Sequence, residues 1–126
     1  MSNLCVSPVI ETDFAAQACL EDGLIKASFS GNADLRFQEA LRLFLGTIHD
    51  EASRLSTSEV WMDFRQLKFM NSSCFKNFVL WITELQEVAA ERQYKIRFIA
   101  NPTMHWQKRS LHALTCFAEE LVSVQS

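Results

Sequence analysis

The stretch VWMDFRQLKFMNSSCFKNFVLWITELQ, residues 60–86, contains the change of pattern that decides the fold. It begins inside a mostly apolar run, Glu59–Phe64, which predicts a strand whose composition suits a sheet covered on both faces. Further along, apolar residues recur at steps of three or four, which predicts a helix from Ser72 to about Arg92. Between the two segments stand Asn71, Ser72 and Ser73, and the role of these three polar residues is the main question that the sequence raises.

The composition narrows the class of protein. A chain of 126 residues with 48% apolar and 21% charged residues predicts one globular domain spanning residues 1–126. The net charge of −3 leaves no broad basic face, which argues against nucleic acid or an anionic membrane as the main partner. The apolar runs are too short to span a bilayer, and the first residues show no secretory pattern, so we expect a cytoplasmic protein.

The cysteines and histidines give no sign of a metal or cofactor site. Zinc sites and disulfide frameworks have closely spaced or matched cysteines, whereas the four cysteines of this chain are scattered. The three histidines are equally dispersed. We therefore expect reduced cysteines that mostly pack, no bound metal and no cofactor.

The rest of the chain predicts alternating strands and helices. The order of predicted elements is β-β-α-β-α-β-α, which indicates an α/β fold with a mixed sheet: parallel strands joined by crossover helices, and N-terminal strands paired antiparallel. The final LVSVQS is either a short last strand or a frayed tail. Besides the elements above, the predicted strands are Leu4–Ile10, Gly23–Gly31 and Tyr94–Asn101, and the predicted helices are Asp34–Leu55 and Met104–Leu114.

On this map, the hydroxyl pair lies just beyond a central strand, in the turn that opens a helix. Ligands of parallel sheets gather at the carboxyl ends of strands, and a helix start carries free N–H groups and positive partial charge. A phosphate on Ser72 would add about −1.5 to −2 charges at this favourable place. The other reading is a plain helix cap, a role for which Asn and Ser are preferred, and the spacing by itself favours the cap.

The same residues carry a resemblance to a known family. Val60–Leu85 resembles the core of the STAS family, the fold of anti-sigma factor antagonists, in which a strand with an aspartate leads through a "fxDSSG" turn into a helix. It is still more similar to the SiaC-type regulatory phosphoproteins, with their "DLRxLxxLN" strand followed by hydroxyl residues and a lysine. Here Asp63, Phe64, Arg65 and Leu67 match the strand, and Asn71, Ser72, Ser73 and Lys76 match the turn.

The resemblance implies a single STAS-like domain that acts as a non-catalytic bacterial signalling switch. It places the phosphoacceptor at Ser72, with Ser73 as second choice, and assigns supporting roles to Asp63, Asn71 and Cys74. The partners that it implies are a histidine-kinase-like Ser/Thr kinase of the anti-sigma type, a PP2C-like phosphatase and, in the SiaC branch, a diguanylate cyclase as target.

The second predicted helix also offers a candidate docking surface. Leu80 and Trp81 broaden its apolar arc, and with Phe75 and Lys76 they would form a partner-binding face beside Ser72. The alternative is that a neighbouring element covers Leu80 and Trp81. Two other functions stay open: a constitutive interaction module without phosphorylation, and a small enzyme that uses Cys74 or Ser72 as nucleophile.

Overall fold

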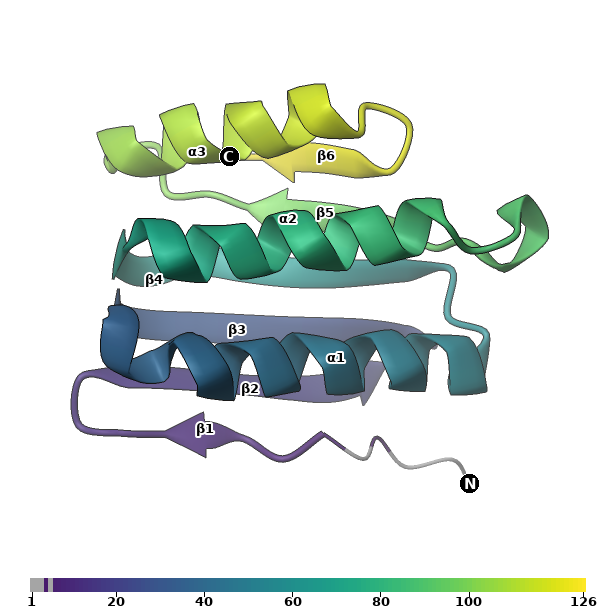
Figure 1. Ribbon diagram of the computed structural model, residues 1–126, viewed down its shortest axis with the longest axis horizontal. Coiled ribbons are helices and arrows are strands. Elements are labelled where there is room, and N and C mark those ends of the chain that lie inside the picture. The colour runs from purple at the N-terminus through teal and green to yellow at the C-terminus, as the bar shows by residue number, and fades with distance from the viewer. Residues whose placement is uncertain (1–3, 5) are drawn as a thin grey trace.

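The structure is a computed structural model that describes residue 4 and residues 6–126. The described residues form one six-stranded sheet in the order β1-β2-β3-β4-β5-β6, together with three α-helices (Figure 1). β1, β2 and β3 pair antiparallel, and β3, β4, β5 and β6 pair parallel. The strands are β1 Val9–Ile10, β2 Phe14–Glu21, β3 Leu24–Ala33, β4 Glu59–Met70, β5 Lys95–Ile99 and β6 Val122–Gln125; the helices are α1 Gln38–Leu55, α2 Ser72–Gln86 and α3 His105–Phe117.

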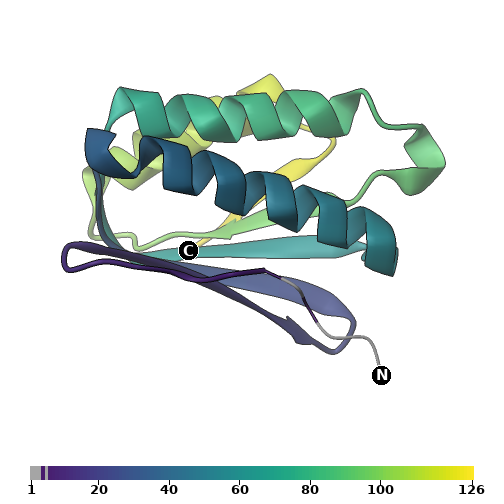
Figure 2. The same cartoon turned by 60° about the horizontal axis from the view of Figure 1, so that its bottom comes forward.

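All three helices lie on the same face of the sheet, as Figure 2 shows. In β4, the buried residues Val60, Met62 and Phe64 alternate with the half-buried Trp61 and Asp63. Successive side chains of a strand point to opposite faces, so the first set packs under the helices and the second lies on the open face. The prediction of a sheet covered on both faces is therefore wrong. It rested on the largely apolar composition of this strand, to which Trp61 on the open face contributes.

A cluster of phenylalanines joins the sheet to α2. Phe29, Phe64 and Phe98 come from three neighbouring strands, and each has its ring centroid within 5.2–6.2 Å of another ring of the cluster or of Phe78 on α2. Phe44 of α1 packs edge-on against Phe29 at 5.6 Å. Such large side chains dominate the free energy of core packing, so the cluster fixes α1 and α2 on the sheet.

The N-terminal part of the predicted fold needs correction. The strand predicted over residues 4–10 is limited to Val9–Ile10, and Cys5 in that range lies outside the described residues. The structure also contains a strand, Phe14–Glu21, that was not predicted from the sequence. It was missed because its AAQA segment has low β-propensity. A tight turn with positive φ at Asp22 and Gly23 connects it to β3.

The C-terminal half matches the predicted order, with shifted boundaries. β4 continues to Met70, six residues beyond the predicted end, and α2 starts at Ser72 as predicted but ends at Gln86. The segment up to Arg92 includes a separate 3-10 turn, Ala90–Arg92. The final residues form the short strand β6, which pairs with β5.

Candidate functional site

At the start of α2, Asn71 caps the helix, and the two serine hydroxyls that follow it take no part in capping. Asn71 has an extended backbone, and its Oδ1 accepts a hydrogen bond from the Cys74 amide at 2.9 Å, so Asn71 is the N-cap. Ser72, the first helical residue, is exposed, and Ser73 is half-buried. Within the described part of the chain, neither serine hydroxyl makes a hydrogen bond and neither serine amide finds an acceptor. Ser72 is thus free of a capping task.

The start of α2 lies where two parallel strands end side by side. The Asn71 amide donates to the carbonyl of Ala33, the last residue of β3, at 2.9 Å. β4 ends at Met70, which pairs with Ala33 in the parallel ladder. The loops that follow β3 and β4 therefore meet at the carboxyl edge of the sheet, the place where parallel sheets usually bind their ligands.

Cys74 is a packing residue rather than a nucleophile. Its side chain is fully buried, and its Sγ donates to the Asp34 carbonyl oxygen at 3.3 Å. Burial, together with the nearby Asp34 charge, raises the pKa of the Cys74 thiol to about 11. The thiol therefore stays protonated at neutral pH, and the idea of an enzyme that uses Cys74 as nucleophile is wrong.

Asp34 is a residue beside this site that the sequence did not single out. Hydrogen bonds from the Arg36 side chain, with a smaller contribution from the Arg36 amide, lower the pKa of the Asp34 carboxyl. The Arg36 guanidinium also reaches Asp13, at 2.9 Å. Sequence reasoning placed Asp34 only at the start of the helix predicted over Asp34–Leu55, because its nearness to Cys74 depends on the folded chain.

Asn77 was missed as well, and it ties α2 to α1. This buried side chain donates through Nδ2 to the carbonyl of Gln38, the first residue of α1, at 2.9 Å. An asparagine among the apolar residues of a helix is a signal that could have been noticed, since a buried amide needs a partner. The bond fixes the first turns of the two helices against each other.

Gln107 holds the end of β4 in place and was also missed. β5 ends at Ile99, which pairs with Asp63, so β5 does not cover the last seven residues of β4. There the fully buried Gln107 of α3 donates through Nε2 to the carbonyls of Phe64 at 2.6 Å and Leu67 at 2.9 Å. Asn101 Nδ2 also donates to the Arg65 carbonyl at 3.1 Å, so these two side chains supply some of the hydrogen bonds that a neighbouring strand would make to this part of β4.

Asp63 does not belong to the site. It lies in the middle of β4, seven residues before the end of the strand, which corresponds to about 23 Å of extended chain. Its carboxylate accepts hydrogen bonds from the Arg65 side chain and amide, and these lower the pKa of Asp63. The prediction that Asp63 supports Ser72 is therefore corrected: the structure pairs Asp63 with Arg65 on the open face instead.

The predicted docking residues divide into two groups. Lys76 and Leu80 are exposed, Leu80 to 47%, and Phe75 is half-buried against the core. Trp81 is only 2% exposed, and its Nε1 donates to the Tyr94 hydroxyl at 2.8 Å, so the assignment of Trp81 to a docking surface is wrong. The covering element is the segment before β5, in line with the alternative reading of that residue.

Two exposed apolar side chains near the site were not predicted. Phe69, three residues before Ser72, is 47% exposed, and Leu35, next to Asp34, is 63% exposed. Single exposed apolar side chains are ordinary on protein surfaces, and they mark an interaction site where they form a contiguous patch. We refer to Leu35, Phe69 and Leu80 as the apolar rim.

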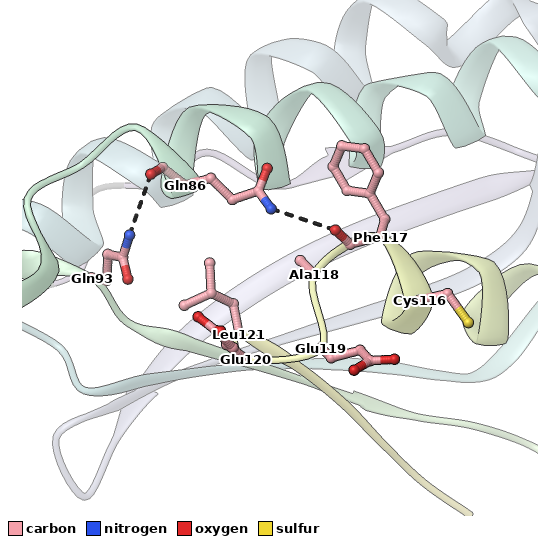
Figure 3. A pocket seen from close by; sticks show the side chains of 8 residues that line it. All are labelled: Gln86, Gln93, Cys116, Phe117, Ala118, Glu119, Glu120 and Leu121. Carbon is pink, nitrogen blue, oxygen red and sulfur yellow. Dashed lines mark hydrogen bonds between the residues drawn. The ribbon is translucent and has the colours of Figure 1, made fainter.

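Two hollows among the described residues do not border Ser72. One of about 470 Å³ is lined by residues from the end of α2, the end of α3 and the segment before β6 (Figure 3). Another of about 450 Å³ lies between α3 and β6. Ser72 lines neither of them, and the described residues contain no group of three His, Cys, Asp or Glu side chains that could hold a metal. Ser72 is thus an exposed residue that borders neither of these two hollows.

Comparison with solved structures shows a likeness in fold. No family model matches the chain, and no curated protein is similar to it in sequence. The fold is similar to a crystal structure of an anti-sigma factor antagonist from Mycobacterium paratuberculosis, with a TM-score of 0.65 and 16% identity over 89% of this chain and 85% of that chain. The STAS-like α/β fold is thereby confirmed. Among the described residues, no helix is long and apolar enough to cross a membrane.

Proposed function

We propose that this protein is a non-catalytic signalling switch whose binding to a protein partner is controlled by reversible phosphorylation of Ser72. The observation that carries the proposal is the separation of roles at the start of α2: Asn71 caps the helix, and the exposed Ser72 has a hydroxyl that bonds to none of the described residues. The likeness in fold to an anti-sigma factor antagonist supports the same class of protein.

The electrostatics of the first turn support a charge switch. A phosphoserine adds about −1.5 to −2 charges and three acceptor oxygens. The unpaired amides of Ser72 and Ser73 and the positive end of the α2 dipole can stabilise that group on the free protein. Phosphorylation therefore need not unfold the helix.

The apolar rim supports a change in partner binding. Leu35, Phe69 and Leu80 are exposed, and burying them against a partner would contribute favourable free energy. A dianionic group beside that contact would have to lose its hydration or meet a matching cation. A partner that fits the unmodified surface is then released or exchanged on phosphorylation.

The partners in this proposal are those of anti-sigma factor antagonists and SiaC-type proteins. A histidine-kinase-like Ser/Thr kinase would add the phosphate, and a PP2C-like phosphatase would remove it, in the cytoplasm. The target is an anti-sigma kinase or a diguanylate cyclase. The single domain of residues 1–126 would contain the whole switch surface, with Phe75 and Lys76 at its edge.

Phosphate mapping tests the switch. Protein incubated with its kinase and ATP should gain the mass of one phosphate, and peptide mapping should place it on Ser72. The Ser72→Ala variant should gain none, while Ser73→Ala, the matched control, should still be modified. Absence of phosphate from both serines, with a kinase active on another substrate, would overturn the proposal and favour the constitutive module.

A further inference from the structure

Helix α3 carries a thiol and an imidazole one turn apart. Cys116 Sγ and His112 Nε2 are 3.4 Å apart, within hydrogen-bond distance for sulfur, and both residues are exposed. The spacing of four residues places the two side chains on the same face of the helix. A base in contact with a thiol can accept its proton and leave the nucleophilic thiolate.

The other described cysteines lack this combination. Cys74 is buried, and its thiol donates to the Asp34 carbonyl. Cys19 is exposed on β2, but it makes no hydrogen bond to a base in the part of the chain that the structure describes. Among the described cysteines, Cys116 has both access to solvent and a base at hand.

The surroundings leave room for a reagent on both sides of the pair. Cys116 borders the hollow of about 470 Å³, whose other lining residues include Gln86 and Glu119 (Figure 3). His112 borders the hollow of about 450 Å³ together with Lys108.

The charged groups around the pair belong mainly to α3 and the segment after it. Lys108 lies one turn before His112, and Glu119 and Glu120 follow Cys116. The facing elements contribute the neutral Gln86 and Gln93 to one hollow, and β6 and the chain end contribute Val124 and Ser126 to the other. The imidazole is thus the base in direct contact with the thiol.

We propose that Cys116 and His112 form a reactive thiol–imidazole pair, a site of reversible modification by low-molecular-weight disulfides. His112 Nε2 takes the thiol proton, and the Cys116 thiolate attacks one sulfur of the disulfide. A protein–small-molecule S–S bond forms while the original S–S bond breaks. The displaced thiolate leaves and takes up a proton, so Cys116 is oxidised and half of the disulfide is reduced.

This site is independent of the proposed phosphorylation of Ser72. Ser72 is the first residue of α2, whereas the hollow at Cys116 borders Gln86, the last residue of the same helix. Fifteen residues of α-helix span about 22 Å, so the two sites lie at opposite ends of the molecule.

The test compares cysteines within the same molecule. The reduced, full-length protein is treated with glutathione disulfide or iodoacetamide at neutral pH, and peptide mapping follows each cysteine over time. We expect Cys116 to react about tenfold faster than Cys19, the exposed internal control. His112→Gln should bring the two rates to within about twofold, while His105→Gln, the matched control at the other end of α3, should change nothing.

The pH dependence of the reaction rate distinguishes a role of His112 as a base from a merely structural role. The rate at Cys116 is followed from mildly acidic to mildly alkaline pH, and its pH profile should differ between the parent protein and His112→Gln while the unfolding temperature stays the same. Equal rates at Cys116 and Cys19 in the parent protein would overturn the proposal. An unchanged rate and pH profile in folded His112→Gln would do so too.

Discussion

Near its start, helix α2 is held by hydrogen bonds to β3 and α1, whereas near its end it is held by longer bonds from the side chains of Gln86 and Gln93. The Asn71 amide donates to the Ala33 carbonyl of β3 at 2.9 Å, and Asn77 Nδ2 donates to the Gln38 carbonyl of α1 at 2.9 Å. At the end, Gln93 Nε2 donates to the carbonyls of Leu85, Gln86 and Val88 at 3.1–3.4 Å. The hydrogen bonds that hold α2 near Ser72 are thus shorter than those at its opposite end, while the Ser72 hydroxyl makes no hydrogen bond within the described residues.

The largest effect should come from Gln107, which supports the start of α2 through the end of β4. Gln107→Leu leaves the buried carbonyls of Phe64 and Leu67 without their donor, which should reduce the free energy of unfolding by about 3 kcal/mol. Denaturant titration measures this loss. Lys108→Ala, on an exposed neighbouring position, should change it by less than about 0.5 kcal/mol; equal effects would refute the supporting role.

A smaller loss is expected at Gly31, beside the same edge of the sheet. Its φ is +83°, and a Cβ there would lie 2.0 Å from the Asp13 carbonyl oxygen. Gly31→Ala should therefore destabilise the protein by about 2 kcal/mol. Gly46 provides the matched control, because a Cβ there meets no atom within 4 Å inside α1. Gly46→Ala should raise the unfolding temperature, and a rise in both variants would contradict the packing described for Gly31.

A smaller change in the free energy of unfolding is expected for Asn71→Ala, and it is to be compared with the change for Ser72→Ala. Asn71→Ala removes the bond to the Cys74 amide and should cost about 1 kcal/mol. Ser72→Ala should change the free energy of unfolding by less than about 0.3 kcal/mol, because its hydroxyl bonds to nothing in the described chain. Thermal unfolding of both variants measures the difference. If Ser72→Ala costs as much as Asn71→Ala, Ser72 is a capping residue.

The smallest effect is expected at the opposite end of α2. Gln93→Ala removes three long bonds from a half-buried amide and should cost about 0.5 kcal/mol. Hydrogen exchange should show faster exchange in the last turn of α2 and no change in its first turn. Uniform loosening of the whole helix would show that its two ends are not held independently.

Much of the fold could be predicted from the sequence, because the spacing of apolar residues indicates which face of each helix or strand is buried. The α2 start at Ser72 and the parallel order of β3, β4 and β5 follow from apolar spacing and turn residues. β2 could not be predicted in this way, because its alanines carry little strand preference and it is stabilised by pairing with β3. The sequence did not show that helices cover only one face of the sheet, because Trp61 places an aromatic side chain on the open face.

The candidate site was predictable only where its residues are neighbours in the sequence. Asn71 and Ser72 could be placed at a helix start, since capping is local. Asp34 and Gln107 reach the site through contacts across about 40 residues, which no local pattern reports. Trp81 was misassigned for the same reason, because its partner Tyr94 lies on another element.

The most direct measurement of the central claim is partner binding by two variants, one with a neutral and one with a negatively charged side chain at position 72. Ser72→Ala and Ser72→Asp proteins are immobilised and compared for capture of the purified partner, with Ser73→Asp as the control for added charge nearby. The account predicts that the affinities of Ser72→Ala and Ser72→Asp differ by at least about tenfold, a coupling of about 1.4 kcal/mol. Equal affinities, or an equal loss in Ser73→Asp, would contradict a switch at Ser72.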